Sequence, residues 1–219
     1  MSARTWFFAA TYDRFIRATE RAGLHDMRTG LVADAVGDVL EIGGGTGANL
    51  GLYGPAVRSL TITEPNPAMV KRLERHVAEV APGTTVLRAP AEDLPFEDDS
   101  FDTVVSTLVL CGVDDQPRAV REVLRVLRPG GRFLFLEHVR ADDPAEAAKQ
   151  DRLNWLNRAV VCCNCNRPTV HTIEEVGFDV AALEHTELPK APPFARPAVI
   201  GTAVPTNVAD EEGAAHAER

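Results

Sequence analysis

Short apolar runs alternate with amphipathic segments through the middle of this chain, and this alternation constrains the fold more than any other feature. Two of the intervening segments have clear helical boundaries: 67–80 begins with a proline, and 118–127 is followed by Pro129, Gly130 and Gly131. Strands that alternate with helices predict an α/β fold built on a doubly wound, mostly parallel sheet. The apolar runs fall at 38–42, 60–64, 85–88, 101–108 and 132–139.

Two further runs complete the expected sheet. We expect 177–183 and 199–204 to form an antiparallel hairpin at one edge, which brings the sheet to seven strands. The run 101–108 is apolar nearly throughout, as a strand buried on both faces should be. We also expect a helix directly after the glycines that follow 38–42. A chain of 219 residues is long enough to form a single domain around one core.

Charge and cysteine content restrict the partners and the compartment. The chain has 23 Lys and Arg against 32 Asp and Glu, and a net charge of −9 disfavours nucleic acid or an anionic membrane as the main partner. No apolar run approaches the ~18 residues of a spanning helix, and the run at 6–10 is too short for a secretory signal. Adjacent cysteines pair poorly, so no disulfide framework is expected. These features predict a cytoplasmic protein. The cysteines are Cys111, Cys162, Cys163 and Cys165.

A glycine-rich loop follows the first apolar run and indicates a nucleotide-like ligand. Glycine occupies every second position from 43 to 47, and without Cβ atoms the backbone lets a ligand approach closely. Glu64 lies twenty-one residues past Gly43, where an acid can accept hydrogen bonds from a ribose diol. Gly43, Gly45 and Ala48 also satisfy a dinucleotide pattern, which leaves an NAD-type oxidoreductase or a non-catalytic binder as alternatives. The acid Glu41, two residues before the first glycine, favours S-adenosylmethionine.

Two longer segments carry a family resemblance. Residues 89–102 and 121–131 resemble the segments before strands four and five of the class I S-adenosylmethionine-dependent methyltransferases. They are most similar to the branch of the ubiquinone and menaquinone C-methyltransferases. The resemblance covers about 36–140 and implies a Rossmann-like methyltransferase fold, an enzyme, and S-adenosylmethionine as methyl donor with S-adenosylhomocysteine as product.

We expect one domain at 1–205 with three segments. Phe8, Tyr12 and Phe15 share one helix face, so 1–35 should be helical, either as a lid over the active site or as an amphipathic helix packed on the domain. The cofactor-binding core would occupy 36–140, and an acceptor-side cap with the closing strands 141–205. The last residues, 206–219, are small, polar and acidic, and we expect them to be disordered.

A cofactor site follows from the same resemblance, residue by residue. The loop glycines would line the methionine half of the cofactor, with Glu41 beneath them, and Glu64 would hold the ribose hydroxyls. Enzymes of this branch usually have an Asp before the residue that matches Ala91, but this chain has Pro90 there. A contact to the adenine amino group must therefore come from Glu92, Asp93 or the backbone. The implied cofactor contacts are Tyr12 as a gate, Glu41, Gly43, Gly45, Gly47, Glu64, Pro65, Met69, Ala91, Glu92 and Thr107.

A narrower resemblance concerns the methyl acceptor. Residues 106–111, 137–139, Cys163-Asn164 with Arg167, and Arg196-Pro197 before Gly201 resemble the animal microsomal thiol S-methyltransferases and their bacterial small-molecule relatives. This implies S-methylation of a small apolar thiol, a metabolite or a thiol-containing natural product. O-, N- or C-methylation of a small metabolite or quinone-like acceptor is the alternative. The animal proteins carry an N-terminal membrane anchor, which we do not expect here.

Several residues on the acceptor side have both a functional and a structural interpretation. His138, at the end of the fifth strand, is a candidate general base or a histidine hydrogen-bonded within the loops. Cys111 is a substrate-side thiol or a buried structural one. Arg167 faces an acidic substrate group or caps backbone carbonyls. Phe8 and Trp155 enclose the acceptor or belong to the core.

A zinc site is the other reading of the cysteine-rich segment. Cys162, Cys163 and Cys165 with His171 do not follow the usual zinc-ligand spacing, because Cys162 and Cys163 are adjacent and Cys163 and Cys165 form C-x-C. We therefore expect no metal among them.

Overall fold

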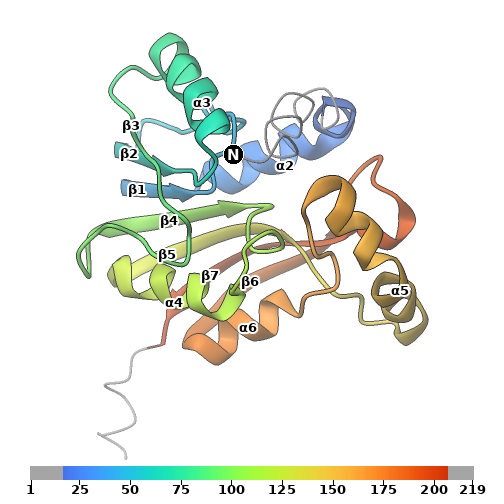
Figure 1. Cartoon of the computed structure of the whole chain (residues 1–219). Helices are drawn as coiled ribbons and strands as arrows, with labels where there is room; N and C mark the ends of the chain where they lie inside the picture. Colours follow the sequence, from blue (N-terminus) through green and yellow to red (C-terminus); the bar gives the residue numbers. More distant parts are fainter. Residues whose placement is uncertain (1–16, 207–219) are drawn as a thin grey trace, which may run out of the picture.

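The computed structural model describes residues 17–206, apart from the side chains of residues 160 and 161. Seven strands form one sheet in the order β3-β2-β1-β4-β5-β7-β6 (Figure 1). Strands β1 to β5 are parallel, whereas β7 is antiparallel to both β5 and β6. The predicted doubly wound, mostly parallel seven-stranded sheet is confirmed. The strands are β1 (Gly37–Ile42), β2 (Val57–Thr63), β3 (Thr85–Leu87), β4 (Phe101–Thr107), β5 (Leu127–His138), β6 (Phe178–Glu187) and β7 (Pro197–Pro205).

Helices cover both faces of the sheet. In Figure 1, α2 and α3 lie on one side of the sheet and α4 and α6 on the other, while α5 lies beyond the edge at which β4 and β5 end. A π-helical turn at Glu20–Leu24 precedes α2, and Gly23 at φ 134° breaks the helical path there. The expected N-terminal helix is thus present but interrupted, and residues 1–16 of the predicted lid lie outside the described residues. The α-helices are α2 (His25–Val32), α3 (Pro67–Val80), α4 (Gln116–Val126), α5 (Pro144–Val161) and α6 (Thr169–Val176).

The nearly continuous apolar character of the central strands reflects burial on two faces. Successive side chains of a strand point to opposite faces, so Val104 and Phe135 pack into the core beneath α4 and α6. Val105 and Leu134 pack into the core beneath α2. All four side chains are inaccessible to solvent. Burial on both faces is the physical reason that these strands show no polar alternation.

The segment after β1 differs from the prediction. Residues 45–52 form successive turns instead of the expected helix, with bonds from the Gly47 N–H to the Gly44 carbonyl (2.9 Å) and from the Leu50 N–H to the Gly47 carbonyl (3.1 Å). Gly47 and Gly51 have φ values of 90° and 80°, and this left-handed conformation cannot continue an α-helix. The glycines that open the loop therefore also prevent a helix from forming immediately behind it.

The closing hairpin packs closely against the centre of the sheet. Gly201 of β7 is paired with Phe135 of β5, and a Cβ atom at position 201 would overlap the Phe135 ring. This close approach explains the glycine in the Arg196-Pro197…Gly201 segment. Within residues 17–206, no helix is both long and apolar enough to cross a membrane. The cytoplasmic location stays a prediction.

Candidate active site

Four parallel strands end at one edge of the sheet, and this edge gathers the predicted site. β1, β2, β4 and β5 end at Ile42, Thr63, Thr107 and His138. Ligands of open α/β sheets bind at this carboxyl edge, where the order of the strands reverses. The strand order reverses at β1, because β2 and β3 extend the sheet to one side of β1 and β4 and β5 extend it to the other.

The three alternate glycines of the loop have different structural reasons. Gly43, Gly45 and Gly47 all have positive φ values, 60°, 58° and 90°. A Cβ at Gly43 would lie 2.6 Å from Val109 Cγ1, and one at Gly47 would lie 2.5 Å from Leu50 Cδ1. At Gly45, no described heavy atom would come within 4 Å of a Cβ. The loop is therefore closed by packing at Gly43 and Gly47 and open at Gly45, where a ligand can approach the backbone.

This difference predicts separate effects of alanine at two positions of the loop. Gly45→Ala should cost about 1 kcal/mol of stability from the left-handed backbone and should weaken cofactor binding by narrowing the open space. Gly43→Ala should cost about 2 kcal/mol, because the strain is joined by the clash with Val109. Urea unfolding and calorimetric titration with S-adenosylhomocysteine measure the two effects. Equal affinity in wild type and Gly45→Ala would show that the open space is not used.

Glu64 links the second strand to the glycine loop. Its carboxylate accepts hydrogen bonds from the Gly45 N–H (2.9 Å) and the Asn66 N–H (2.8 Å). The residue is 5% exposed, and burial raises the pKa of the carboxyl group. The acid predicted to bind a ribose thus also orients the open part of the loop. Nearby, Pro65 is exposed and Met69 is buried on α3.

Glu41 lies beneath the loop, at the centre of a buried polar network. Its carboxylate accepts from Asn49 Nδ2 (3.0 Å) and from the Tyr53 hydroxyl (2.7 Å). Arg28 of α2 donates to Asn49 Oδ1 (3.2 Å) and to the hydroxyl oxygen of Thr107 (2.7 Å). The network therefore connects α2, β1, the loop and the end of β4. Sequence reasoning included Glu41 and Thr107 and missed the other three residues, which have no motif of their own.

The burial of Glu41 predicts a pH dependence of stability. Burial disfavours the anion and raises the pKa of Glu41 to about 7, against 4.5 ordinarily. Between those pH values the folded chain keeps a proton that the unfolded chain releases, so the free energy of unfolding should fall as pH rises from 4.5 to 7 and level off above. Urea unfolding across this range, compared with Glu41→Gln, isolates the effect. A constant difference between the two proteins at every pH would contradict it.

The residues expected near the adenine have structural roles in the chain. Ala91 is buried in the core beneath α4. Glu92 accepts a hydrogen bond from the Asp114 N–H (2.7 Å), which fixes the segment before α4. Asp115 then caps α4 by accepting from the Arg118 N–H (3.0 Å). The adenine contacts of Ala91 and Glu92 stay predictions.

On the acceptor side, the structure brings together a histidine and two cysteines. His138, at the end of β5 as expected, lies with Cys111 and Cys163, and one ligand-type atom of each is within 4.8 Å of the other two. The Cys111 thiol and His138 lower the pKa of Cys163. The pKa of Cys111 is correspondingly raised. Burial alone would lower the pKa of His138, but the neighbouring Cys163 and Glu137 raise it, and the overall shift is upward.

The four residues considered for zinc are not gathered. Cys162 is exposed, and the Cys165 thiol faces Asn154 Oδ1 at 3.7 Å. His171 is exposed and pairs with Glu175 at 3.2 Å. Cys163 alone of the four belongs to the buried group at His138. Its neighbours in that group, Cys111 and His138, come from distant segments, and residue spacing in the sequence could not show that the three lie together.

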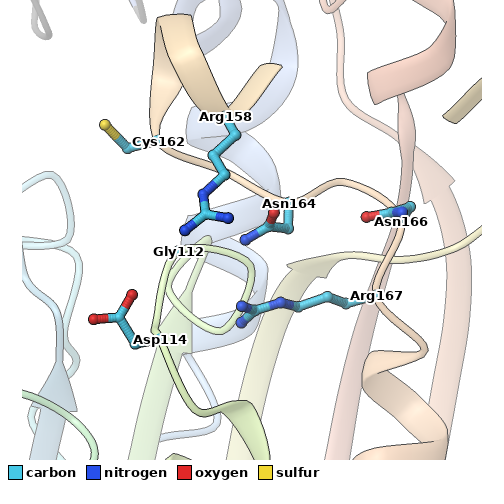
Figure 2. A pocket seen from close by; sticks show the side chains of 7 residues that line it. All are labelled: Gly112, Asp114, Arg158, Cys162, Asn164, Asn166 and Arg167. Carbon is cyan, nitrogen blue, oxygen red and sulfur yellow. The ribbon is translucent and has the colours of Figure 1, made fainter. Parts of the chain in front are cut away.

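A polar cavity of about 380 Å³ is lined in part by the chain neighbours of Cys111 and Cys163. Figure 2 shows Arg158 of α5 and Arg167 reaching towards it from different segments. Arg167 donates to the carbonyls of Leu110 and Val113, both at 2.7 Å, so the capping interpretation describes its contacts in the structure. The lining consists of Gly112, Asp114, Arg158, Cys162, Asn164, Asn166 and Arg167.

Trp155, which was expected near the acceptor, is not among the described residues that line this cavity. Trp155 is 68% exposed on α5. Phe8 and Tyr12 lie outside the described residues. Their roles over the acceptor and the cofactor stay predictions.

The residues at the carboxyl edge fit an adenosyl cofactor. Gly45 opens onto free space, and the Glu64 carboxylate at the end of β2 is the type of group that accepts hydrogen bonds from ribose hydroxyls. The sheet that carries this site has one antiparallel strand, β7, inserted between β5 and β6. Fold and site together define a class I methyltransferase that uses S-adenosylmethionine.

Comparisons with known proteins agree. Residues 40–135 match the methyltransferase domain family. Human thiol S-methyltransferase TMT1A is 37% identical over 178 residues, covering 76% of this chain and 70% of the human one. The ubiquinone/menaquinone biosynthesis C-methyltransferase of Idiomarina loihiensis is 36% identical over 104 residues, covering 45% of this chain and 41% of its own. The chain belongs to the methyltransferase family that contains these enzymes.

A solved structure shows the same fold. An S-adenosylmethionine-dependent methyltransferase from Thermotoga maritima superposes with a TM-score of 0.66 over 93% of this chain and 99% of its own. Sequence identity between the two is 20%, so this likeness concerns the fold alone.

Proposed function

We propose that this enzyme transfers the methyl group of S-adenosylmethionine to the sulfur of a small thiol. The observation that carries the proposal is the 37% identity with TMT1A, which extends over 76% of the chain. The domain-family match ends at residue 135, so the similarity to a thiol methyltransferase includes segments outside the general methyltransferase core.

The chemistry of a thiol acceptor suits a site of this kind. The cofactor supplies a methyl group already activated by its sulfonium, so the chain has to bind and orient the acceptor and exclude water. A thiol of pKa near ~8.5 is a few per cent thiolate at pH 7, which is nucleophilic enough without a strong base. Glu64 would hold the ribose, Gly45 would face the methionine half, and Thr107 would border the site from β4.

The same proposal assigns segments to tasks. Residues 36–140 would bind the cofactor, and 141–205 would cover the acceptor. Residues 1–35 would close the site as a lid, of which α2 and the preceding π-helical turn are described. Arg158, Asn164 and Asn166 line the cavity on the acceptor side, where their polar groups would orient a small thiol.

A matched acceptor panel tests the proposal. With methyl-labelled S-adenosylmethionine, the purified enzyme should label thiophenol and an alkane thiol but neither phenol nor aniline. Phenol and aniline are the matched controls, because they differ from thiophenol only in the attacking atom and its hydrogens. Glu64→Ala serves as a control for cofactor-dependent transfer. Labelling of phenol or aniline without thiophenol would replace the proposal by O- or N-methylation.

A further inference from the structure

Cys111, His138 and Cys163 form a buried group in which each side chain offers an atom that can bind a metal ion. The two sulfur atoms and a ring nitrogen lie within 4.8 Å of one another, and the three residues are 2%, 9% and 7% exposed. They come from three places: the loop after β4, the end of β5, and the segment between α5 and α6.

Hydrogen bonds hold the backbone of this group in place. The Cys111 carbonyl accepts from the Asn164 N–H (2.8 Å), which ties the loop after β4 to the residue next to Cys163. The Cys163 carbonyl accepts from Asn157 Nδ2 (3.0 Å). Thr169 donates its hydroxyl to the His138 carbonyl (3.0 Å). These bonds fix the backbone on which the three side chains meet. The Cys111 thiol also faces the Leu108 carbonyl (3.6 Å), and the Cys163 thiol interacts with Cys111 and His138.

One atom of the group has no partner of its own. His138 Nδ1 is buried and makes no hydrogen bond within the part of the chain that the structure describes. A buried ring nitrogen without a partner is costly, and such groups in native proteins have a reason. Coordination of a metal by the imidazole would be such a reason, and the other ring nitrogen would then be free to orient the ring. It would also account for the two thiols beside His138.

We propose that Cys111, His138 and Cys163 bind a Zn²⁺ ion. Two thiolates and an imidazole are the soft and borderline donors that zinc prefers. Zn–S bonds of ~2.3 Å place tetrahedral ligand atoms about 3.8 Å apart, so the present separations close by small side-chain rotations. Two thiolates neutralise the ion, which makes a buried site electrically balanced. Three protein ligands leave the fourth position to water or an external ligand, and His138 then holds a metal and does not act as a proton acceptor.

Cobalt substitution tests this site without reference to methyl transfer. The full chain, reduced and stripped with a chelator, is titrated with Co²⁺ while absorption is recorded. One equivalent should produce thiolate-to-cobalt charge transfer in the near ultraviolet and the intense visible bands of tetrahedral cobalt, and Zn²⁺ should displace both. Zinc should also raise the melting temperature of the stripped chain. A folded, reduced wild type without these bands overturns the proposal.

Four cysteine variants identify the ligands. Cys163→Ser and Cys111→Ser should lose the charge-transfer bands, whereas Cys162→Ser and Cys165→Ser should keep them, which controls for general effects of removing a thiol. Unchanged bands in Cys163→Ser, or equal loss in Cys165→Ser, contradict the assignment. The wild-type titration decides the matter if a variant does not fold. A Cys111–Cys163 disulfide that persists under reducing conditions, seen by intact mass, equally overturns it.

Discussion

Replacing Glu64 with alanine is expected to weaken the binding of S-adenosylhomocysteine by about 1.5–3 kcal/mol, the range for hydrogen bonds to a charged group. With about 1.4 kcal/mol for each factor of ten, the dissociation constant should rise roughly ten- to a hundredfold. The carboxylate would lose its bonds to the ribose hydroxyls, and the Gly45 N–H would lose the acceptor that orients the loop. Calorimetric titration measures the change directly.

Glu64→Gln separates these two contributions. The glutamine keeps an oxygen for the Gly45 N–H (2.9 Å in the wild type) but cannot accept from two hydroxyls with a full charge. Its affinity should therefore fall between those of wild type and Glu64→Ala, with the melting temperature closer to wild type. Unchanged affinity in Glu64→Ala, in a folded protein, would show that the ribose does not bind at the end of β2.

The central strands could be predicted from sequence because their physical cause is local. Burial on both faces removes polar residues from a strand such as 101–108, and no tertiary knowledge is needed to see it. The turns at 45–52 were predicted as a helix, because glycine spacing shows conformational freedom but does not say which φ values a loop adopts. Gly47 and Gly51 take left-handed values, and the helix is lost.

The candidate site divides in the same way. The positions of Glu41, Glu64 and His138 at strand ends follow from the strand assignment, since the carboxyl ends of parallel strands share an edge. The partners of these residues depend on how distant segments pack. Cys111 meets Cys163 from a distant segment, and Tyr53 reaches Glu41 only because the turns after β1 bring the chain back over that strand. Spacing in the sequence indicates neither pair.

Among the residues whose partners could not be predicted from the sequence, Arg28 is the one on which the stability of the fold should depend most. Its side chain is 4% exposed and donates from Nε to Glu20 (3.1 Å), besides its bonds to Asn49 and Thr107. Removing one partner of a buried charged network costs about 3–5 kcal/mol, because the remaining polar atoms stay buried without partners. We therefore expect Arg28→Leu, which keeps the apolar volume, to lower the free energy of unfolding in urea by that amount.

Glu20→Gln is the matched control for this measurement. The Glu20 side chain is 20% exposed and contacts the guanidinium only at Nε, and glutamine keeps an oxygen for that N–H, so Glu20→Gln should cost under about 1 kcal/mol. Arg28 also lowers the pKa of Glu41, so in Arg28→Leu the fall of stability with pH should extend above pH 7. If Arg28→Leu were no less stable than Glu20→Gln, the network beneath the glycine loop would not hold α2 to the sheet. A loss confined to Arg28→Leu would instead identify Asn49 and Thr107, the inner partners, as the contacts through which α2 stabilises the cofactor edge.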